Sequence, residues 1–392
     1  MAARIVVIAG TRPEAVKLAP VVLAARRDAR FDVALVASGQ HPTAVHEALE
    51  WFDLESDFTL VCERRDASLT SLFAELLQRV GELLASVSAD AVLVQGDTST
   101  ALASALASFY HDVPVAHVEA GLRTSDLYKP FPEEAHRRML SEVTSLHLAP
   151  TTGAAARLLR EAHARMAIVT TGNTVVDAAL AVAERRAPYP TTRLEELDAS
   201  GRPIVVVTAH RRESWGEPMS RITAALVELQ RRYPGVGFVF ALHPNPALSA
   251  AIAAELAETD VVCTPPVPYG PFTRLLARAT LVISDSGGIQ EEAPSFDVPV
   301  VVLRDETERP EGVALGCAHL VGTATEAIVE TTTDLIERSL SGWRPVLVNP
   351  YGDGRAAERV VRAIGWQLGI DERPAEFVFD ASCPCAQRDH SV

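Results

Sequence analysis

Short, continuously apolar runs alternate along the chain with longer segments whose apolar residues recur at helical spacing. Such runs are typical of strands buried on both faces of a parallel sheet, and the longer segments are typical of the helices that cover it. The first set of predicted strands comprises residues 5–9, 33–37, 91–94, 113–117, 146–149 and 167–170. Helical patterns such as 15–26 and 69–86 lie between them.

The same alternation restarts after a break rich in proline and charge, residues 185–203. The second set of predicted strands comprises residues 204–208, 237–242, 261–263, 281–284 and 298–303. Two such sets predict two Rossmann-like, doubly wound α/β domains that face each other across a cleft. The predicted segments are a first domain at 1–170, a second at 171–353, a helix packing back on the first domain at 354–373 and a polar, flexible tail at 374–392.

The net charge of the chain argues against a nucleic-acid partner. The 392 residues include 36 Lys and Arg against 51 Asp and Glu, which gives a net charge of −15. Duplex nucleic acid requires a basic surface, so no nucleic-acid partner is expected. An anionic ligand would instead have to meet a few locally placed cations or helix N-termini.

The sequence predicts neither export nor insertion into a membrane. The first ten residues resemble a strand rather than a signal peptide, and no apolar run approaches the roughly 18 residues of a membrane span. Five scattered cysteines suit a reducing compartment, and the pair Cys383 and Cys385 is interpreted as flexible thiols in the tail. A cytoplasmic protein is therefore expected.

Ligands of doubly wound sheets bind at the carboxyl ends of the strands, so the residues that follow each strand are the candidates for function. Arg12 and Lys17 surround a predicted helix N-terminus, which favours an anion. Asp97 and Glu119 each follow a strand beside a glycine, and Glu133 begins a helix. Asp97 could instead cap a helix and Glu133 could complement a helix dipole, whereas a buried Glu119 must be paired. Three carboxylates at one edge would suit proton transfer at a carbon acid.

The strongest local pattern follows a predicted strand of the second domain. Ser286, Gly287 and Gly288 lead from that strand into a helix, and the glycines allow a phosphate group to approach the backbone. Glu292 lies about 9 Å farther along the helix, a span that suits a ribose. Arginines in the segment 304–310 add positive charge near the same edge. These features together predict a site for a nucleoside diphosphate.

Two histidines, His210 and His243, also follow strands of the second domain, although a core histidine or a loop-shaping residue is the ordinary alternative. Other chemistries lack their sequence patterns. The chain has no G-x-G-x-x-G motif after a strand, no phosphate loop of the NTPases, no helical histidine pair for zinc and no G-x-S-x-G nucleophile motif. No metal or redox cofactor is therefore expected.

Several segments, in order along nearly the whole chain, resemble the bacterial non-hydrolysing UDP-N-acetylglucosamine 2-epimerases. These segments are Gly10-Thr-Arg-Pro-Glu-Ala-Val-Lys17, Gln95-Gly-Asp97-Thr, His117-Val-Glu119-Ala-Gly-Leu-Arg123-Thr, Pro132-Glu133-Glu134, His210-Arg-Arg-Glu213, Asp285-Ser-Gly-Gly-Ile-Gln-Glu-Glu292 and Glu308-Arg309-Pro310-Glu311. The resemblance implies a GT-B-like fold, a homodimer, a UDP-sugar substrate and no cofactor. It further implies anti elimination of UDP across carbons 1 and 2 to give 2-acetamidoglucal, followed by re-addition to give UDP-N-acetylmannosamine.

The resemblance also implies roles for individual residues. Asp97, Glu119 and Glu133 would be the acid and base groups, and His210 would assist near the leaving phosphate. Phe272 would stack on the uracil. Substrate contacts would come from Arg12, Lys17, His243, Phe272, Ser286, Gly287, Gly288, Glu292 and Arg309.

Some members of that family bind a second substrate molecule as an activator, and the matching positions here include Gln40, His41 and Arg211. The chain departs from the family at two places. Thr43 stands where some bacterial members have glutamine, which concerns the activation and not the chemistry. His136 stands where the family often has asparagine.

Other functions remain open from the sequence. A hydrolysing 2-epimerase would release N-acetylmannosamine and UDP, and the segment Arg12-Pro13-Glu14 favours the non-hydrolysing branch. An epimerase of another UDP-2-acetamido sugar would use the same acids. A retaining GT-B glycosyltransferase would need an acceptor and would leave the three carboxylates of the first domain without a purpose. A non-catalytic nucleotide-sugar sensor would not need every catalytic position to be filled.

Overall fold

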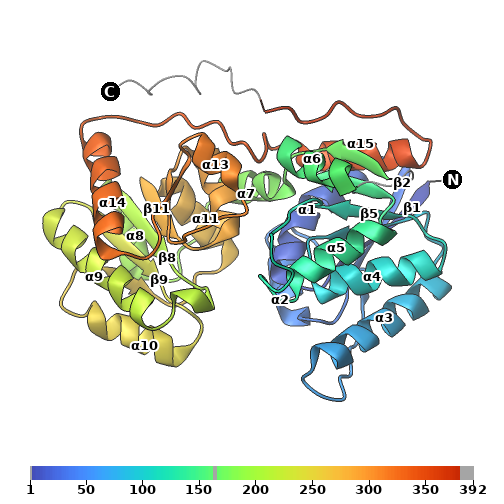
Figure 1. Cartoon of the computed structure of the whole chain (residues 1–392), viewed down its shortest axis with the longest axis horizontal. Coiled ribbons are helices and arrows are strands. Elements are labelled where there is room, and N and C mark those ends of the chain that lie inside the picture. The colour runs from blue at the N-terminus through green and yellow to red at the C-terminus, as the bar shows by residue number, and fades with distance from the viewer. Residues whose placement is uncertain (1, 162–165, 380–392) are drawn as a thin grey trace. The chain divides into compact units, whose positions relative to one another are not determined.

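The computed structural model describes residues 2–161 and 166–379, which form two compact units (Figure 1). Unit 1 extends to Ala178 and resumes at Tyr351, and unit 2 begins at Ala179 and ends at Pro350. The sequence analysis placed these borders after residues 170 and 353, whereas the first border falls inside helix α7 (Thr174–Glu184). The predicted thiol pair at positions 383 and 385 lies outside the described residues.

Unit 1 is built on a parallel sheet that has seven strands in its described residues, in the order β3-β2-β1-β4-β5-β6-β7. The strands are β1 (Ala3–Ala9), β2 (Phe31–Ala37), β3 (Phe58–Thr59), β4 (Ala91–Gln95), β5 (Val115–Val118), β6 (Leu146–Ala149) and β7 (Ala167–Thr170). The helices are α1 (Arg12–Arg26), α2 (Pro42–Glu50), α3 (Leu69–Ser86), α4 (Ser99–Tyr110), α5 (Glu133–Val143), α6 (Thr152–Glu161), α7 and α15 (Ala356–Gln367). The predicted strands agree with these bounds to within two residues, and only the two-residue edge strand β3 was missed.

The strand order brings the loops after β1 and β4 together. β1 lies between β2 and β4, so the order of the strands reverses at the β1–β4 pair and leaves a crevice at the carboxyl edge of the sheet. The loop after β1 approaches the first turn of α4 so closely that a Cβ atom on Gly10 would lie 1.9 Å from Oγ1 of Thr100. Glycine is therefore required at the end of β1 by a close approach.

Helix α15 completes unit 1 although it follows unit 2 in the chain. Figure 1 shows it in red among the blue and green elements of unit 1, and it packs against α1. Its first turn is capped from α7, because the carboxylate of Asp177 accepts hydrogen bonds from the N–H groups of Ala356 (3.2 Å) and Ala357 (2.8 Å). These bonds satisfy donors that have no partner inside the helix.

Beyond α15 the chain runs along β7 instead of leaving the unit. The N–H of Phe377 donates to the carbonyl of Thr170 at 2.7 Å, and the carboxylate of Glu376 accepts from the N–H of Thr170 at 3.2 Å. The Phe377 ring is buried. Residues 374–379, at the start of the tail that was predicted to be flexible, therefore contact unit 1, because the polar composition conceals one apolar side chain that packs on the unit.

Unit 2 repeats the plan with six parallel strands in its described residues, in the order β10-β9-β8-β11-β12-β13. The strands are β8 (Ile204–Thr208), β9 (Gly237–Ala241), β10 (Val262–Thr264), β11 (Leu281–Ser284), β12 (Val300–Val302) and β13 (Ala318–Leu320). The helices are α8 (Thr192–Ala199), α9 (Glu217–Arg232), α10 (Pro246–Glu255), α11 (Tyr269–Arg278), α12 (Gly287–Glu292), α13 (Pro310–Ala314) and α14 (Thr325–Leu340), with short 3-10 turns at Arg212–Ser214 and Ala293–Phe296. The two sheets confirm the predicted fold class of two doubly wound α/β domains.

The predicted break at residues 185–203 is not an open connection. It contains helix α8, and Leu194 and Leu197 of this helix are buried in the core of unit 2. The proline and charge content of the stretch conceals two apolar positions one turn apart, which are enough to anchor a short helix.

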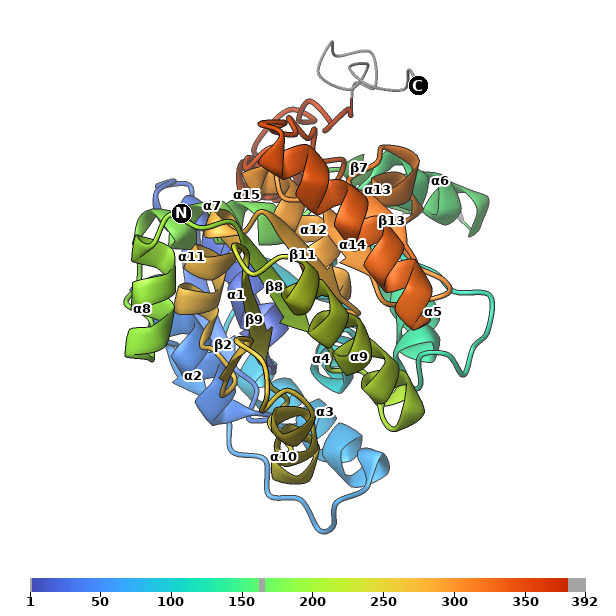
Figure 2. The same cartoon turned by 90° about the vertical axis from the view of Figure 1, so that its left-hand side faces the viewer.

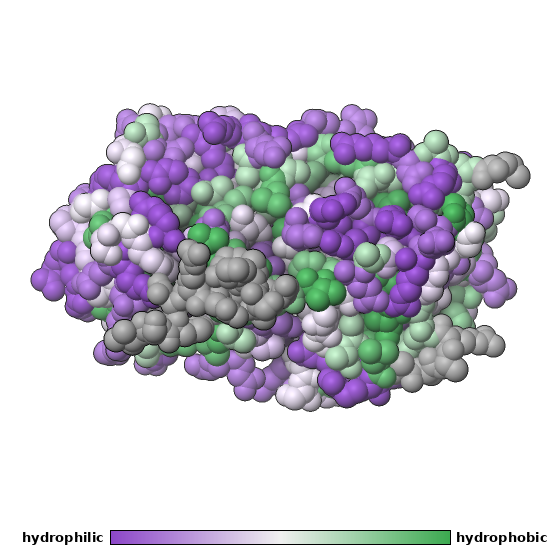
Figure 3. Space-filling model, turned by 90° about the horizontal axis from the view of Figure 1, so that it is seen from above, coloured by the Kyte–Doolittle hydropathy of each residue, from purple (hydrophilic) through white to green (hydrophobic). Residues whose placement is uncertain are grey.

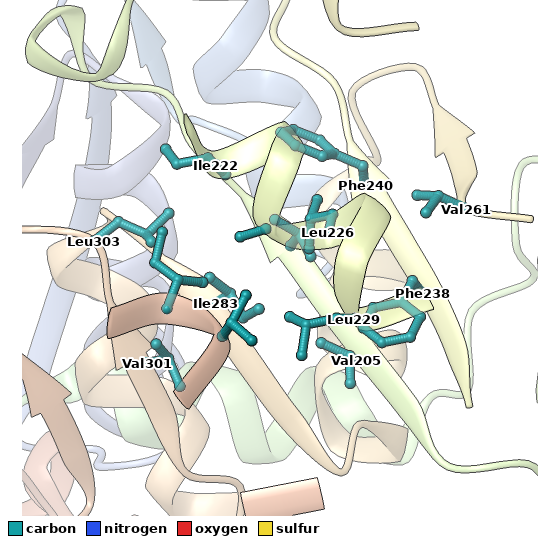
Figure 4. Packing of buried hydrophobic residues seen from close by; sticks show 14 of the residues in the cluster. Val205, Ile222, Leu226, Leu229, Phe238, Phe240, Val261, Ile283, Val301 and Leu303 are labelled. Carbon is teal, nitrogen blue, oxygen red and sulfur yellow. The ribbon is translucent and has the colours of Figure 1, made fainter. Parts of the chain in front are cut away.

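The core of unit 2 explains the uninterrupted apolar run of β8. Val205 points to one hydrophobic cluster and Val206 points to a second cluster on the opposite face of the sheet. Figure 4 shows Ile222, Leu226 and Leu229 of α9 in the first cluster. Figure 2 shows α9 and α14 side by side, and the two helices are in contact. Because both faces of the strand are covered, its positions before Thr208 are all apolar.

The surface agrees with a chain in which 22% of the residues are charged. Hydrophilic residues predominate on the face seen in Figure 3, and hydrophobic residues lie between them in small groups. Within the described ranges, no helix is long and apolar enough to cross a membrane.

Candidate active site

A pocket of about 130 Å³ opens at the carboxyl edge of the unit 1 sheet. Its walls come from α1, from the loops that follow β1, β4 and β5, and from α5. The lining residues are Thr11, Pro13, Glu14, Lys17, Gln95, Gly96, Asp97, Thr98, Glu119, Leu122 and Arg137. Three predicted site residues, Lys17, Asp97 and Glu119, are therefore brought together.

Glu119 is held in the pocket by two donors. The ammonium of Lys17 and the side-chain amide of Gln95 both donate to its Oε2 atom. Only 9% of Glu119 is exposed, so this pairing supplies what a buried carboxylate requires. Its φ of +66° lies in the left-handed region that residues with a Cβ atom avoid, and such strain is typical of functional sites.

Asp97 is held by Arg137 of α5. The Nε and Nη2 atoms of this arginine lie 2.8 and 2.7 Å from Oδ2 of Asp97. The alternative that Asp97 caps α4 is wrong, because Thr98 is the cap and its Oγ1 accepts from the N–H of Ala101 at 3.0 Å. The carboxylate of Asp97 is thus directed to Arg137 and the pocket rather than to the helix.

Glu14 contributes a third carboxyl group to the lining. Its side chain has no exposed surface. Oε1 accepts from the hydroxyl of Thr98 at 2.7 Å, and Oε2 accepts from the N–H of Gly10 at 3.1 Å. Burial raises the pKa of Glu14 to about 7, although the hydrogen bonds from its neighbours oppose the shift. The pocket therefore contains a carboxyl group that titrates near neutral pH.

Two other predicted residues of unit 1 are not among the lining residues. Arg12 exposes its side chain, and its Nη2 lies 3.7 Å from Oε2 of Glu47. Glu133 is the first residue of α5 and is half-buried. Its neighbour Glu134 is fully buried, and its Oε2 lies 3.3 Å from Nη1 of Arg137. The pocket lining thus includes two of the three predicted acids.

The residues predicted to bind a second substrate molecule have other contacts. Oε1 of Gln40 accepts from the N–H of Thr100 at 3.2 Å and from its hydroxyl at 2.8 Å, which ties the loop after β2 to α4. His41 is exposed directly before α2. Arg211 belongs to unit 2, where its Nε donates to the carbonyl of Asp285 at 3.1 Å.

In unit 2, Asp285 organises the loop that follows β8. Its buried carboxylate accepts from the N–H of His210 at 3.0 Å, from the N–H of Arg211 at 2.9 Å and from the hydroxyl of Ser214 at 2.7 Å. β8 and β11 are neighbours where the strand order of unit 2 reverses, so a residue at the end of β11 can reach this loop. Asp285 therefore fixes the backbone of His210.

The ring of His210 is hydrogen-bonded through Nε2 to the hydroxyl of Thr208. The ring of His243 lies 5.8 Å away, and Trp215 meets His243 edge-on at 5.4 Å between centroids. Partial burial lowers the pKa of His210; Asp285 opposes this shift, and His243 adds to it. The two predicted histidines of unit 2 thus lie together, and His210 is uncharged at neutral pH.

Helix α12 begins directly after β11, as predicted for a phosphate-binding turn. A Cβ atom on Gly287 would lie 2.4 Å from Nη1 of Arg309, so the guanidinium covers the start of this helix. The Nε of Arg309 donates to Oε1 of Glu291 at 2.8 Å. A cation and a helix N-terminus are therefore side by side, which is a favourable setting for an anion.

The remaining predicted residues of unit 2 lie at helix α12 or against the hydrophobic core of this unit. Ser286 is the N-cap of α12. A Cβ atom on Gly288 would lie 3.5 Å from Oε1 of Glu292, which shows that this carboxylate turns back toward the start of the helix. Phe272 lies in the first turn of α11, where it is partly buried against the core of unit 2.

The arginines of the segment 304–310 are paired with acids. Nη1 of Arg304 lies 2.8 Å from Oε2 of Glu308, and Nη1 of Arg309 lies 3.6 Å from the same atom. Burial alone would raise the pKa of Glu308, but Arg304 and Arg309 lower it to about 2. Glu308 is therefore a permanent anion that holds both guanidinium groups.

Within residues 2–161 and 166–379, no group of three or more His, Cys, Asp or Glu side chains has the arrangement of a metal site. The groups that could hold an anionic ligand are Lys17 and Arg137 in unit 1, and Arg309 with the start of α12 in unit 2.

Sequence reasoning missed four residues that shape these sites. Glu14, Gln95 and Arg137 line the pocket, and Asp285 holds the loop of His210. Each of them lies in a segment that was already of interest, but each acts on a partner from another element. Glu14 carried the one usable signal, a charged residue whose following helical residues up to Ala25, apart from Lys17, are apolar.

Comparison with known proteins places this geometry in a family. The sequence profile of UDP-N-acetylglucosamine 2-epimerase matches residues 23–365. The chain is 42% identical over 369 residues to a probable UDP-N-acetylglucosamine 2-epimerase of Ralstonia nicotianae, covering 92% of this chain and 98% of that one. It is 39% identical over 373 residues to the UDP-N-acetylglucosamine 2-epimerase of Escherichia coli K12, with the same coverage.

Solved structures agree. The UDP-GlcNAc 2-epimerase of Neisseria meningitidis bound to UDP-GlcNAc has a TM-score of 0.83 and 38% identity, with 92% of this chain and 99% of that chain covered. The S. aureus MnaA–UDP structure has a TM-score of 0.87 and 35% identity, with 96% and 100% covered. MurG of Acinetobacter baumannii shares the fold at a TM-score of 0.54 and 15% identity, with 92% and 98% covered. The profile match and the sequence identity over most of the chain show that the chain belongs to the UDP-N-acetylglucosamine 2-epimerase family.

Proposed function

We propose that this chain interconverts UDP-N-acetylglucosamine and UDP-N-acetylmannosamine without hydrolysis. The observation that carries the proposal is the pocket of unit 1, in which two carboxylates, Asp97 and Glu119, are each held by a cation. Complexes of relatives with UDP-GlcNAc and with UDP support the substrate class.

The reaction has demanding requirements at carbon 2 of the sugar. Its proton is weakly acidic, so it leaves only as the bond from carbon 1 to the diphosphate oxygen breaks. The electron pair of the C–H bond then forms the double bond of 2-acetamidoglucal, and UDP departs with the electron pair of the C–O bond. In the return step, UDP adds to carbon 1 and a proton is delivered to the opposite face of carbon 2. A base, an acid on the other face and cations at the diphosphate are therefore needed.

The carboxylates of unit 1 are assigned to the proton transfers. Asp97 and Glu119 line the same pocket from the loops after two neighbouring strands, β4 and β5. Glu133 is retained as the third acid, because the start of α5 lies one turn before Arg137, which lines the pocket. A single carboxylate could not reach both faces of carbon 2 unless the intermediate turned.

The groups of unit 2 are assigned to UDP. The backbone at Ser286, Gly287 and Gly288 and the Arg309 guanidinium would bind the diphosphate, because a helix N-terminus and a cation adjoin there. Glu292 would accept hydrogen bonds from the ribose hydroxyls, and Phe272 would stack on the uracil. The neutral ring of His210, with His243 beside it, would donate a hydrogen bond to the leaving phosphate.

Three further features belong to the proposal. Arg12 would contact the sugar diphosphate together with Lys17 when substrate binds. Gln40, His41 and Arg211 would contribute to a second substrate molecule that activates the enzyme. The enzyme would act as a homodimer, for which the exposed apolar side chains at the end of α4 offer a contact surface.

Proton NMR of the enzyme with UDP-N-acetylglucosamine in heavy water tests the proposal. We expect UDP-N-acetylmannosamine to accumulate toward equilibrium, with deuterium at carbon 2 of both sugars. Free N-acetylmannosamine released together with UDP would replace the proposal with a hydrolysing reaction. An unchanged spectrum would show that UDP-N-acetylglucosamine is not the substrate.

The acid and base assignment predicts that substitutions in unit 1 lower kcat, whereas a substitution in unit 2 weakens UDP binding. Asp97→Asn and Glu119→Gln should each lower kcat by roughly 10²- to 10⁴-fold, because each removes a group that transfers a proton. The affinity for UDP, measured by calorimetry, should stay within twofold of the wild type. Glu292→Ala should instead weaken UDP binding by about tenfold, through the loss of a charged hydrogen-bond acceptor. Wild-type kcat in both acid variants would contradict the assignment.

A further inference from the structure

Two buried histidines contact consecutive carbonyl groups of the turn that carries Asp97. Nε2 of His117 lies 2.7 Å from the carbonyl oxygen of Gly96, and Nδ1 of His136 lies 2.8 Å from the carbonyl oxygen of Asp97. His117 comes from β5 and His136 from α5, so two elements on different sides of the turn converge on it. The two residues are 1% and 8% exposed.

The contacts define which ring nitrogens carry protons. A carbonyl oxygen only accepts hydrogen bonds, so Nε2 of His117 and Nδ1 of His136 must both be protonated. Burial lowers the pKa of His117 to about 4, so its ring is neutral and its Nδ1 carries no proton. That nitrogen has no hydrogen-bond partner in the described part of the chain. The single donor of His117 is therefore committed to the carbonyl of Gly96.

The two carbonyls belong to the two peptide groups that flank the Cα atom of Asp97. The carbonyl of Gly96 belongs to the peptide group before the Cα atom of Asp97, and the carbonyl of Asp97 belongs to the peptide group after it. When both peptide groups are held, φ and ψ of Asp97 are held with them, and the direction of its Cα–Cβ bond is fixed. Arg137 then holds the far end of the side chain at 2.7 Å.

The turn needs this external support because it begins with Gly96, whose φ is +72°. Glycine has no side chain to restrict the backbone, so it allows many conformations that would aim Asp97 elsewhere. One backbone bond, from the N–H of Gly96 to the carbonyl of Val118 at 3.1 Å, holds the start of the turn. The bond from the Thr98 hydroxyl to Glu14 holds the end of the turn, and the histidines hold the two peptide groups on either side of Asp97.

We propose that His117 and His136 are positioning residues that aim the Asp97 carboxylate at the substrate by holding the two peptide groups on either side of it. This inference rests on the proposed function, in which Asp97 transfers a proton. Neither histidine is among the residues that line the pocket, so both act through Asp97 and not on the sugar.

The positioning role can be tested with side chains that place an amide nitrogen at the same number of bonds from Cα as the histidine nitrogen that donates. Nδ1 of histidine is separated from Cα by the same number of bonds as the amide nitrogen of asparagine, and Nε2 by the same number as that of glutamine. His136→Asn and His117→Gln therefore keep a donor at the required reach. His136→Gln and His117→Asn carry the same amide group at the wrong reach, and His136→Leu and His117→Leu carry none.

The six variants and the wild type are compared by the rate of carbon-2 epimerisation of UDP-N-acetylglucosamine. We expect the two leucine variants and the two wrong-reach variants to lose roughly 10- to 100-fold in kcat, the order that a displacement of about 1 Å causes at an active site. KM should change by less than threefold. His136→Asn and His117→Gln should keep kcat within threefold of the wild type, with an unchanged pH profile above pH 5.

Thermal unfolding and UDP affinity are measured for every variant, so that a loss of kcat is interpreted only in a protein that is folded and binds UDP. The proposal fails for a histidine if its leucine variant keeps wild-type kcat, or if its right-reach and wrong-reach variants lose kcat equally. A loss of kcat in His117→Gln at neutral pH would mean that the imidazole itself takes part in the chemistry.

Wild type and Asp97→Asn in the same assay separate this inference from the function on which it rests. A wild type that does not epimerise the substrate overturns the proposed function. A wild type that turns over, an inactive Asp97→Asn and fully active leucine variants together overturn the positioning role alone.

Discussion

Glu14 is the most deeply buried of the acids that line the pocket. Its carboxyl group is fully buried and receives hydrogen bonds from Thr98 and Gly10, which come from the loops after β4 and β1. It thus joins the two loops that form the crevice. With its pKa raised to about 7, this group is a mixture of acid and carboxylate at neutral pH. The cost of burying it therefore depends on pH.

This dependence leads to a prediction for stability. The folded-state pKa of Glu14 is raised from 4.5 to about 7, so its favourable contribution is complete below pH 4.5 and is lost as the pH rises through 7. Glu14→Gln keeps the shape without titrating. The free energy of unfolding of the wild type, relative to this variant, should therefore rise as the pH falls from 8 to 4.5, by about 3 kcal/mol at most.

Urea unfolding at several pH values measures the difference, in which the other titrating groups cancel. The exposed Glu55→Gln serves as the control and should run parallel to the wild type. A constant difference between the wild type and Glu14→Gln would show that Glu14 does not titrate between these pH values.

At the scale of residues, the sequence located the acids of the pocket but not their partners. Asp97 and Glu119 could be predicted because each directly follows a buried strand, and the carboxyl edge of a parallel sheet is where ligands bind. Arg137 lies 40 residues from Asp97, in a helix whose approach depends on the whole sheet. No periodicity along the chain contains that information, because it arises only from packing.

At the scale of elements, the start of α12 combines two glycines with different reasons for being glycine. At Gly287, a Cβ atom would lie 2.4 Å from the Arg309 guanidinium, which Glu291 and Glu308 hold in place. At Gly288, the nearest atom would be at 3.5 Å, an ordinary contact. Gly287 makes room for the Arg309 guanidinium, whereas at Gly288 the protein without ligand has space for a methyl group.

Alanine substitutions at Gly287 and Gly288 form a matched pair of variants whose stabilities should differ. Gly287→Ala should lower the free energy of unfolding by about 1–3 kcal/mol, because Arg309 must move away from its buried partner. Gly288→Ala should be neutral or stabilising by up to about 1 kcal/mol, since alanine favours a helix over glycine. Chemical denaturation measures both, and UDP affinity should fall with Gly287→Ala. Equal stability of the two variants would show that Arg309 yields without cost.

The elements that the sequence did not predict are short or lie in polar surroundings. Strand β3 has two residues and β13 has three, too few for a pattern to be recognised. Helix α8 was hidden in a stretch of charges and prolines, although Leu194 and Leu197 anchor it. By contrast, α3 has the bounds 69–86 that its apolar spacing predicted, because eighteen residues at helical period leave no competing interpretation.

At the scale of the whole molecule, the chain leaves unit 1 within α7 and returns to it at Tyr351. Residues from both ends of the sequence therefore share one core. Several contacts fix the returning segment on unit 1. Among them, Asp177 caps α15, α15 packs on α1, and Phe377 pairs with Thr170 of β7. Unit 1 is thus complete only when the C-terminal segment has been added.

Phe377 tests whether the last of these contacts stabilises unit 1. Phe377 is 7% exposed, and the Arg359 guanidinium lies 5.4 Å from the centroid of its ring, whereas the next residue, Val378, is 72% exposed. Phe377→Ala should lower the free energy of unfolding by roughly 3 kcal/mol, because it removes a buried ring and leaves a cavity beside β7. Val378→Ala should stay within about 0.5 kcal/mol of the wild type.

Urea unfolding followed by tryptophan fluorescence measures both variants. Since the unit 1 pocket lies at other strands of the same sheet, kcat at 25 °C should be unchanged in each. A Phe377→Ala protein as stable as the wild type would show that the segment after α15 lies on unit 1 without stabilising it.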